Sequence, residues 1–322
     1  MSEAALDRAM PGGEVRLAVD RAITPAPAPA PAPASAAPAT APAPIPAPVP
    51  APAQRPRRAV DPIAAARNLP RGDVSEFQRS FRHWFSRTIS ATVMKTFFRL
   101  ELSGREHIPD GPAVYCFNHL SWLDPMLLLA IFPDRPRIHF YGPKEANLKD
   151  GARNKFMWWT SVIVPFSPLK DDLLTSVKWA QAVFDTGNIL AISGEGTIHV
   201  HEGDLLPFQE GAAYLALRGG VPIVPIGITG TSWARFRSTV RVRVGEPIET
   251  GERPTRQAIA NLTARAWHAV KDIVAEDRDR TPPWWFERWL TDLVNDWGPG
   301  GRAAADLRRG PDPADVPIPP AA

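Results

Sequence analysis

The sequence predicts an α/β protein with a mainly parallel sheet flanked by helices, and two observations carry this prediction. From Leu100 to about Glu276, short apolar runs typical of buried strands alternate with longer stretches of helical periodicity. Strands separated by helices favour parallel pairing, because each connection has to cross over the sheet before the next strand begins. A hydrophobic fraction of 44% with 22% charged residues is ordinary for a globular protein with a sizeable core.

The N-terminal part of the chain differs in composition from the rest. Residues 25–52 alternate Ala and Pro almost without interruption, a composition that cannot build a core and is typical of an extended spacer. We therefore expect residues 1–60 to form a disordered Ala/Pro-rich arm. A folded domain is expected over residues 61–280.

An amphipathic helix is predicted at the start of this domain. Asp73, with Glu76 three residues later, resembles a capping arrangement. Behind it, up to about Arg99, large apolar residues recur at steps of three and four: Phe77, Phe81, Trp84, Phe85, Ile89, Val93 and Phe97. Such a face packs on its own domain or, since no acidic residue follows Glu76 in this stretch, lies on a membrane surface.

The elements of the predicted sheet and its helices follow in order. Strands are expected at 113–117, 137–141, 162–166, 189–193, 221–228 and 239–244, and helices at 125–131, 152–159, 172–186, 210–218 and 255–276.

The C-terminal region contains a second aromatic segment. Trp285, Trp289, Leu293 and Trp297 fall on one helical face, which predicts a Trp-rich helix within 281–298. Tryptophan favours the membrane–water boundary because its ring is apolar while its N–H needs a polar partner, although packing on the domain would also satisfy it. Residues 299–322 are rich in Pro, Ala and charge, and we expect a disordered tail.

Charge, cysteine content and hydropathy indicate where the protein works. A net charge of only +3 predicts no nucleic-acid partner, and the single cysteine, Cys116, fits a reducing compartment. The first seven residues do not resemble a secretory signal, and no run of about 18 apolar residues is present. We expect a cytoplasmic location, peripheral on the inner face of the membrane.

His119 and Asp124 are the candidate catalytic pair. Histidine suits the removal of a proton from a hydroxyl because its pKa is ordinarily close to neutral, and a nearby carboxylate fixes its tautomer. The pair follows the predicted strand 113–117, and open α/β sheets bind ligands where strands end. The same spacing recurs at His199 and Asp204, so the spacing alone is weak evidence.

Two hypotheses of other classes remain open. His199 and His201, with Glu202 and Asp204 nearby, suggest a metal-dependent hydrolase, although the sequence offers few further ligands. A catalytically silent protein that binds membranes through its aromatic helices is the other.

Four ordered blocks extend the evidence beyond the pair. They are 102–112, then 118–124 (Asn-His-Leu-Ser-Trp-Leu-Asp), then 193–197 (Ser-Gly-Glu-Gly-Thr) with 206–212, and the Val-Pro block 221–226. In this order they resemble the glycerolipid acyltransferase family, which includes 1-acylglycerol-3-phosphate acyltransferases. The resemblance implies an acyltransferase fold, an acyl-CoA or acyl carrier protein donor, a lysophospholipid-type acceptor and no metal or other cofactor.

The resemblance also implies roles for individual residues. His119 would be the base and Asp124 its partner, and the substrate would be bound by Asn118, Ser121, Lys144, Glu195, Gly196 and Thr197. Gly194 and Gly196 would let backbone approach the substrate closely. Ser167 and Ile198 stand where the family usually has arginines that grip the acceptor phosphate. This departure favours a neutral or zwitterionic acceptor, such as an amino-lipid or glycolipid, as the alternative.

Overall fold

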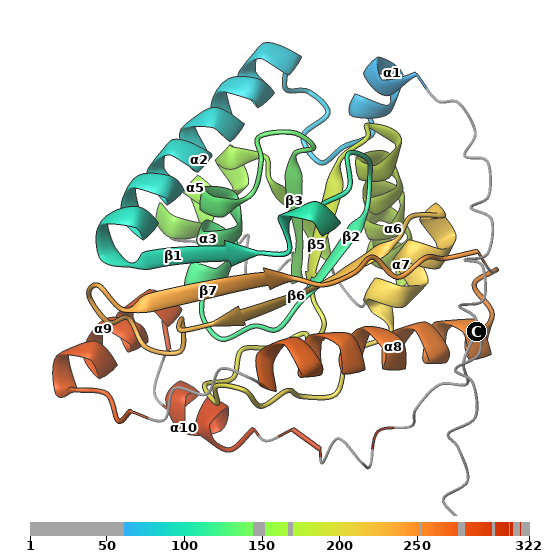
Figure 1. The fold of residues 1–322 in the computed structure, drawn as a ribbon. Helices are drawn as coiled ribbons and strands as arrows, with labels where there is room; N and C mark the ends of the chain where they lie inside the picture. Colours follow the sequence, from blue (N-terminus) through green and yellow to red (C-terminus); the bar gives the residue numbers. More distant parts are fainter. Residues whose placement is uncertain are drawn as a thin grey trace, which may run out of the picture. The chain divides into compact units, whose positions relative to one another are not determined.

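The computed structural model describes residues 61–143, 152–166, 170–251, 253–275, 281–297, 300–308, 310–311 and 316. Within them a single sheet carries flanking helices (Figure 1). The strands are β1 (Arg99–Ser103), β2 (Val114–Phe117), β3 (Ile138–Pro143), β4 (Ile163–Phe166), β5 (Ile189–Ser193), β6 (Ile223–Thr229) and β7 (Thr239–Val244). The helices are α1 (Pro62–Ala66), α2 (Glu76–Phe97), α3 (Leu123–Ile131), α5 (Ala152–Thr160), α6 (Lys170–Asp185), α7 (Gly211–Gly219), α8 (Arg256–Ala275), α9 (Trp285–Asn295) and α10 (Gly301–Asp306), and a 3₁₀ turn spans Arg105–His107.

The sheet has seven strands in the order β1-β7-β6-β2-β5-β3-β4 and is mainly parallel, as predicted. Only the β6–β7 pair is antiparallel among its described pairings. All six predicted strands are present, within two residues of their expected bounds. β1 was not predicted, because its alternation of charged and half-buried residues at the edge of the sheet lacks a continuous apolar run.

Both faces of the sheet are covered, which explains the uninterrupted apolar runs. In the central strand β2, Tyr115 and Phe117 pack into a core shared with α3, whereas Val114 and Cys116 pack into a second core shared with α6, α7 and α8. Alternate side chains of a strand point to opposite faces, so a strand between two cores must be apolar throughout. Figure 1 shows α2, α3 and α5 on one side of the sheet and α6, α7 and α8 on the other.

Helix α2 buries its polar face and exposes its apolar face, the reverse of an ordinary amphipathic helix. It buries Met94 and a polar face made of Arg79, His83, Ser86 and Ser90 against the domain. Its aromatic face points outward: Phe77 is 83% exposed and Trp84 is 59% exposed. Most of this face therefore does not pack on its own domain, although Phe85 contacts Phe156 and Trp159 of α5. Its N-terminus is capped by Ser75 with Gln78 in a capping box, rather than by Asp73 with Glu76.

Polar contacts explain how α2 can bury its polar side. Arg79 donates to the carbonyls of Arg71 and Val74, and His83 lies 3.4 Å from a carboxylate oxygen of Asp134. Burial lowers the pKa of His83 to about 4, so the buried imidazole is neutral near pH 7.

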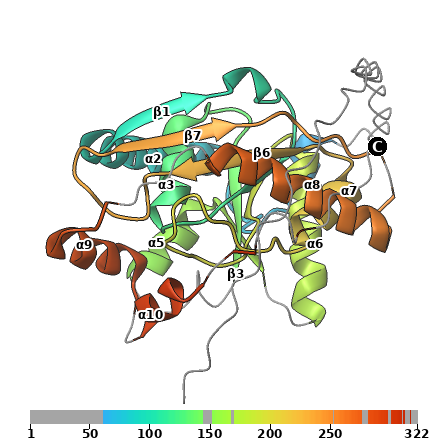
Figure 2. The same ribbon diagram turned by 60° about the horizontal axis from the view of Figure 1, so that its bottom comes forward.

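The two C-terminal helices lie next to each other (Figures 1 and 2). α9 falls within the predicted Trp-rich helix. Part of the predicted disordered tail is helical, because Gly301–Asp306 forms α10, with Ala305 fully buried and Arg302 donating to Asp292. Composition alone did not show these contacts. The predicted arm, residues 1–60, lies outside the described residues, and no helix among those described is long and apolar enough to cross a membrane.

Candidate active site

The predicted catalytic pair forms at the carboxyl end of the central strand. His119 follows β2 directly, and Asp124 lies in the first turn of α3, so the intervening turn brings the two side chains together. His119 Nδ1 lies 2.8 Å from Asp124 Oδ2. The carboxylate is fully buried, whereas 15% of the His119 side chain is exposed. The base can therefore reach a ligand while its partner is shielded from water.

The surroundings of Asp124 assign the tautomer of His119. Oδ2 also accepts the backbone N–H groups of Leu120 (2.8 Å) and Ser121 (2.9 Å), and Oδ1 accepts the Thr231 hydroxyl at 2.6 Å. Oδ2 is thus surrounded by donors, so His119 Nδ1 carries the proton and donates it. Nε2 is left as the unprotonated acceptor, as a general base requires.

Asn118 and Ser121, which were predicted to bind substrate, are buried and hold the catalytic loop. Asn118 is 1% exposed, and its amide bonds both ways with the backbone of Ile228, donating at 2.8 Å and accepting at 2.7 Å. Ser121 is fully buried, and its hydroxyl donates to Asn295 Oδ1 at 3.2 Å. Asn295 also accepts the backbone N–H of Trp122, so α9 is bonded to the catalytic loop.

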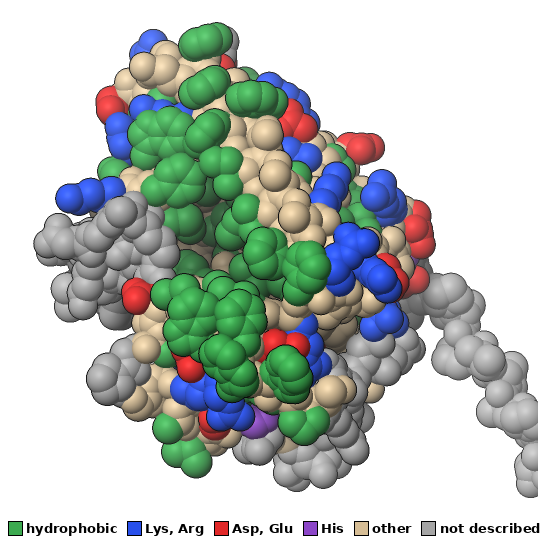
Figure 3. All heavy atoms as spheres, turned by 90° about the vertical axis from the view of Figure 1, so that its left-hand side faces the viewer, with side chains coloured by type: hydrophobic (Ala, Val, Ile, Leu, Met, Phe, Trp, Pro, Cys, Tyr) green, Lys and Arg blue, Asp and Glu red, His purple; other side chains and the backbone are tan. Residues whose placement is uncertain are grey.

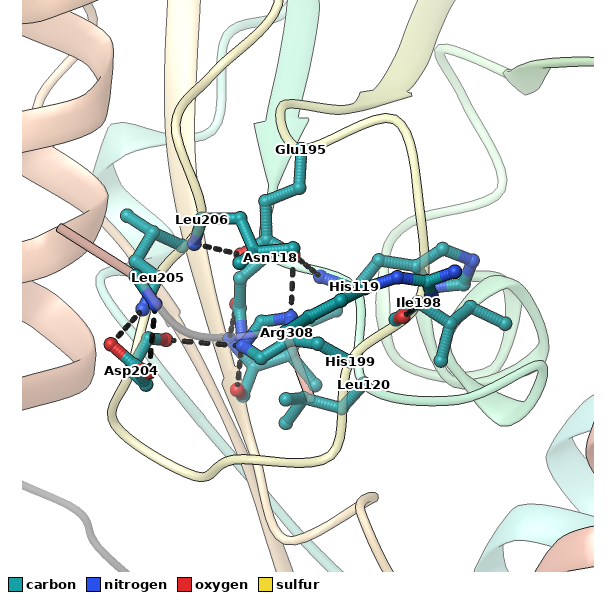
Figure 4. Close-up of polar contacts among 12 residues, drawn as sticks. Asn118, His119, Leu120, Glu195, Ile198, His199, Asp204, Leu205, Leu206 and Arg308 are labelled. Carbon is teal, nitrogen blue, oxygen red and sulfur yellow. Dashed lines mark hydrogen bonds and ion pairs between the residues drawn. The ribbon is translucent and has the colours of Figure 1, made fainter. Parts of the chain in front are cut away.

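The third block supports the backbone of His119. Glu195 is 3% exposed, and its carboxylate accepts the N–H of His119 at 3.4 Å, while the N–H of His199 donates to the His119 carbonyl at 3.1 Å (Figure 4). Glu195 Oε2 and His199 Nδ1 lie 2.8 Å apart. Burial raises the pKa of Glu195, opposed by the hydrogen bond and charge of His199. Burial alone would lower the pKa of His199, but the bond to Glu195 raises it overall.

The glycines of this block serve different purposes. A Cβ on Gly194 would lie 2.6 Å from the Phe208 ring, so this glycine is required by packing and not by an approaching substrate. Gly196 has φ +68°, in the left-handed region that favours glycine. Both Gly196 and Thr197 line the cavity beside His119. Lys144 lies outside the described residues.

The two histidines of the metal hypothesis do not face a common point. His199 pairs with Glu195, whereas His201 Nε2 bonds to the Asp306 carbonyl at 2.8 Å. No group of three or more possible ligands that could hold a metal ion occurs in the part of the chain that is described. The arrangement of His199 and His201 therefore does not support a metal-dependent hydrolase.

A cavity of about 1050 Å³ opens in front of His119. Its wall is largely apolar and includes Phe117, Met157, Ile163 and Leu215, drawn from both faces of the sheet. The polar part of the lining includes His119, Glu195, Thr197 and Arg308. An apolar cavity with a few convergent polar groups is suited to a ligand with a long hydrocarbon part and a reactive polar part.

Two residues around the site, Thr231 after β6 and Asn295 at the end of α9, were missed by sequence reasoning. Glu202, after the third block, was considered only in the metal hypothesis. Glu202 Oε1 accepts the N–H groups of Gly230 (3.0 Å) and Ser232 (3.3 Å), which flank Thr231. Glu202 therefore supports the turn that presents Thr231 to Asp124.

Glu202 should make stability depend on pH. Burial raises its pKa from 4.5 to about 7, against the hydrogen bonds of Ser232 and Gly230. Folding then takes up a proton between these two values, so the contribution of Glu202 to stability falls as pH rises from about 5 to 8. Glu202→Gln cannot ionise and should gain stability relative to the wild type over this interval, by up to about 3 kcal/mol.

Denaturant unfolding at pH 5 and pH 8 measures this difference. The exposed Glu246 provides a matched control, and Glu246→Gln should show no comparable change. An equal effect of Glu202→Gln at both pH values would contradict the prediction.

Comparisons with known proteins agree with the fold. The family model described as Acyltransferase matches residues 99–229, which include β1, the catalytic pair, the third block and β6. The crystal structure of a 1-acyl-sn-glycerophosphate acyltransferase from Thermotoga maritima aligns with a TM-score of 0.51 at 21% identity. It covers 69% of this chain and 94% of that one, and shows that the two share a fold.

Relatives in sequence have the same description. The chain is 26% identical over 232 residues to a 1-acyl-sn-glycerol-3-phosphate acyltransferase of Pseudomonas aeruginosa, covering 67% of this chain and 82% of the relative. It is 30% identical to the human alpha enzyme of that name, over 55% of this chain and 64% of the relative. A chloroplastic relative from Brassica napus is 27% identical, and the chain spans only 44% of it. The family model and the sequence relatives agree that the chain is similar to the glycerolipid acyltransferase family, as the four sequence blocks predicted.

Proposed function

We propose that the protein is an O-acyltransferase that moves a fatty acyl group from acyl-CoA or acyl carrier protein to a hydroxyl of a lysophospholipid-type acceptor. The observation that carries the proposal is the His119–Asp124 pair at the polar part of a large apolar cavity. Relatives named as 1-acyl-sn-glycerol-3-phosphate acyltransferases support the same reaction class.

The geometry supports the following steps for such a transfer. Nε2 of His119 takes the proton of the acceptor hydroxyl as its oxygen attacks the thioester carbonyl. A carbon–oxygen bond forms, the carbon–sulfur bond breaks, and the proton leaves with the thiol. Asp124 holds the imidazole in the required tautomer and stabilises the imidazolium that forms during the attack. The apolar wall of the cavity has room for acyl chains.

We further propose that the protein works on the inner membrane surface from the cytoplasmic side. Two exposed, mainly aromatic patches support this proposal: the α2 patch (Phe77, Phe81, Trp84, Ile89 and Phe97) and the α9 patch (Trp284, Trp285, Phe286, Trp289 and Leu293). Phe236 is 68% exposed, and the centroid of its ring lies 5.8 Å from that of Phe97. Figure 3 shows hydrophobic side chains gathered on this face, with a hollow between two clusters. A soluble protein rarely exposes so many large apolar side chains without a partner surface.

A thioester-release assay across an acceptor panel tests the reaction. The panel contains lysophosphatidic acid, zwitterionic lysophospholipids and neutral acceptors of matched chain length, each with acyl-CoA or acyl carrier protein. Acceptor-dependent thiol release should occur with at least one lysophospholipid and be lost in His119→Ala. Release with an amino-lipid or glycolipid alone would favour the non-phosphate alternative, and release that persists in His119→Ala would overturn the mechanism.

A further inference from the structure

A C-terminal strap, defined as residues 300–308 with Gly310, folds back onto the loop after the third block. The Asp306 carbonyl accepts from His201 Nε2 at 2.8 Å, and the Gly310 N–H donates to Asp204 Oδ2 at 2.9 Å. A Cβ on Gly310 would lie 2.1 Å from the Leu205 carbonyl oxygen, so the strap fits closely against this loop. At its other end, Arg302 donates to Asp292 and lies over the Trp233 and Trp297 rings.

The strap carries Arg308 into the cavity that holds His119. The Arg308 Nη1 group donates to the carbonyl of Ile198, which lies 110 residues earlier in the chain (Figure 4). Among the described residues that line the cavity, Arg308 is the only lysine or arginine. This cation therefore comes from a segment that sequence composition predicted to be disordered.

The guanidinium retains unused binding capacity. It has five N–H donors in a planar fork, and Ile198 is its one hydrogen-bond acceptor among the described residues. The nearby carboxylate of Glu195 is already paired with His199 at 2.8 Å. A cation beside a largely apolar wall is best stabilised by a bound anion, and the fork of an arginine matches two phosphate oxygens.

The position of Arg308 bears on the acceptor. The sequence has Ile198 directly after Glu195-Gly196-Thr197, where an arginine was expected to grip a phosphate. Arg308 bonds to the backbone carbonyl of Ile198. Its guanidinium therefore lies beside the residue that stands in place of the expected arginine. The missing arginine therefore does not leave the polar part of the cavity without a cation.

We propose that Arg308 binds a phosphate group of a substrate in the cavity. The identity of that substrate rests on the proposed acyl transfer. The phosphate belongs to the acceptor headgroup or to the acyl donor, and both present the same anionic oxygens. The strap is thereby part of the active site.

Steady-state kinetics of Arg308→Gln and Arg308→Lys distinguish the two sources. With lysophosphatidic acid and monoacylglycerol of the same chain as acceptors, an acceptor site predicts that Arg308→Gln raises KM only for the phosphate-bearing one. The expected increase is about 10- to 100-fold, and Arg308→Lys should recover part of it. A donor site predicts a raised KM for acyl-CoA with both acceptors, but not for a phosphate-free acyl thioester. Arg218→Gln, at an exposed arginine outside the cavity lining, is the matched control. Unchanged KM values for every substrate in Arg308→Gln would overturn the proposal.

A binding measurement separates this proposal from the reaction itself. Calorimetric titration of the full chain with sn-glycerol 3-phosphate and with coenzyme A needs no turnover. The affinity of at least one of these two ligands should be about tenfold or more lower for Arg308→Gln than for the wild type, and Arg218→Gln should bind it as the wild type does. Gly310→Val, which should displace the strap without touching the cavity, should weaken the same ligand. If neither ligand binds the wild type, or if both bind Arg308→Gln as tightly, the phosphate site is refuted even where acyl transfer is established.

Discussion

Replacing His119 by alanine is expected to lower kcat for acyl transfer by about 10⁴-fold, because the variant loses the imidazole that takes the acceptor proton. Glu195 should not replace it, because its carboxylate is paired with His199 and with the backbone of the catalytic loop. KM should change little, since the apolar cavity wall remains. His119 is partly exposed, so the variant should keep the thermal stability of the wild type.

The contacts of Asp124 predict a smaller loss for Asp124→Asn, of about 10²-fold. Three N–H donors point at Oδ2, so the amide oxygen of asparagine should take that position and keep the tautomer of His119. Its NH₂ group would then face the Thr231 hydroxyl, which can rotate to accept. What is lost is the negative charge that stabilises the imidazolium.

Adding Thr231→Val to Asp124→Asn tests this account. The NH₂ group would be left buried without an acceptor, which costs about 1–3 kcal/mol and favours the flipped amide with the wrong tautomer. The double variant should therefore lose at least about tenfold more activity than Asp124→Asn, whereas Thr231→Val alone should have a mild effect. Steady-state rates of the four proteins check the ranking. Equal activity of the single and double variants would contradict it.

The sequence was sufficient for the elements whose signal is local. β2, β5 and β6 are continuous apolar runs because each lies between two cores, and the catalytic pair lies within one turn after β2. Thr231, Asn295 and Arg308 could not be found in this way. Thr231 and Asn295 reach the catalytic loop, and Arg308 reaches Ile198, because β6 is the neighbour of β2 and because the C-terminal segment packs back on the domain. Such contacts depend on tertiary structure, and no spacing in the sequence records them.

Helix α2 shows a second limit of sequence reasoning. The three- and four-residue steps correctly predicted a helix with one aromatic face, but periodicity does not say which face meets the solvent. The opposite face, with Arg79, His83 and two serines, has the same spacing. It is nevertheless the buried face, where Arg79 Nη2 donates to the carbonyls of Arg71 and Val74 and His83 lies near Asp134.

Replacing Trp285 and Trp289 together by serine is expected to weaken binding to anionic vesicles by about 100-fold. The two indoles are 77% and 53% exposed on the outer face of α9, so the change should cost little in the folded state. If half of each ring enters the membrane, the loss is about 3 kcal/mol, which corresponds to about two orders of magnitude in the partition coefficient. Flotation with phosphatidylglycerol vesicles measures it, and Leu174→Ser, at another exposed apolar residue, is the control.

Variants on the two sides of α9 allow membrane binding and catalysis to be tested separately. Asn295, on the buried side of α9, holds the catalytic loop through Ser121 and Trp122, whereas the two tryptophans point away from it. The Trp variant should therefore turn over a short-chain, water-soluble acceptor at the wild-type rate but lose activity on a long-chain acceptor embedded in vesicles. Asn295→Leu should do the reverse, lowering kcat on both acceptors while vesicle binding persists. If the Trp variant floats with vesicles as the wild type does, α9 does not contact the membrane and its exposed face needs another explanation.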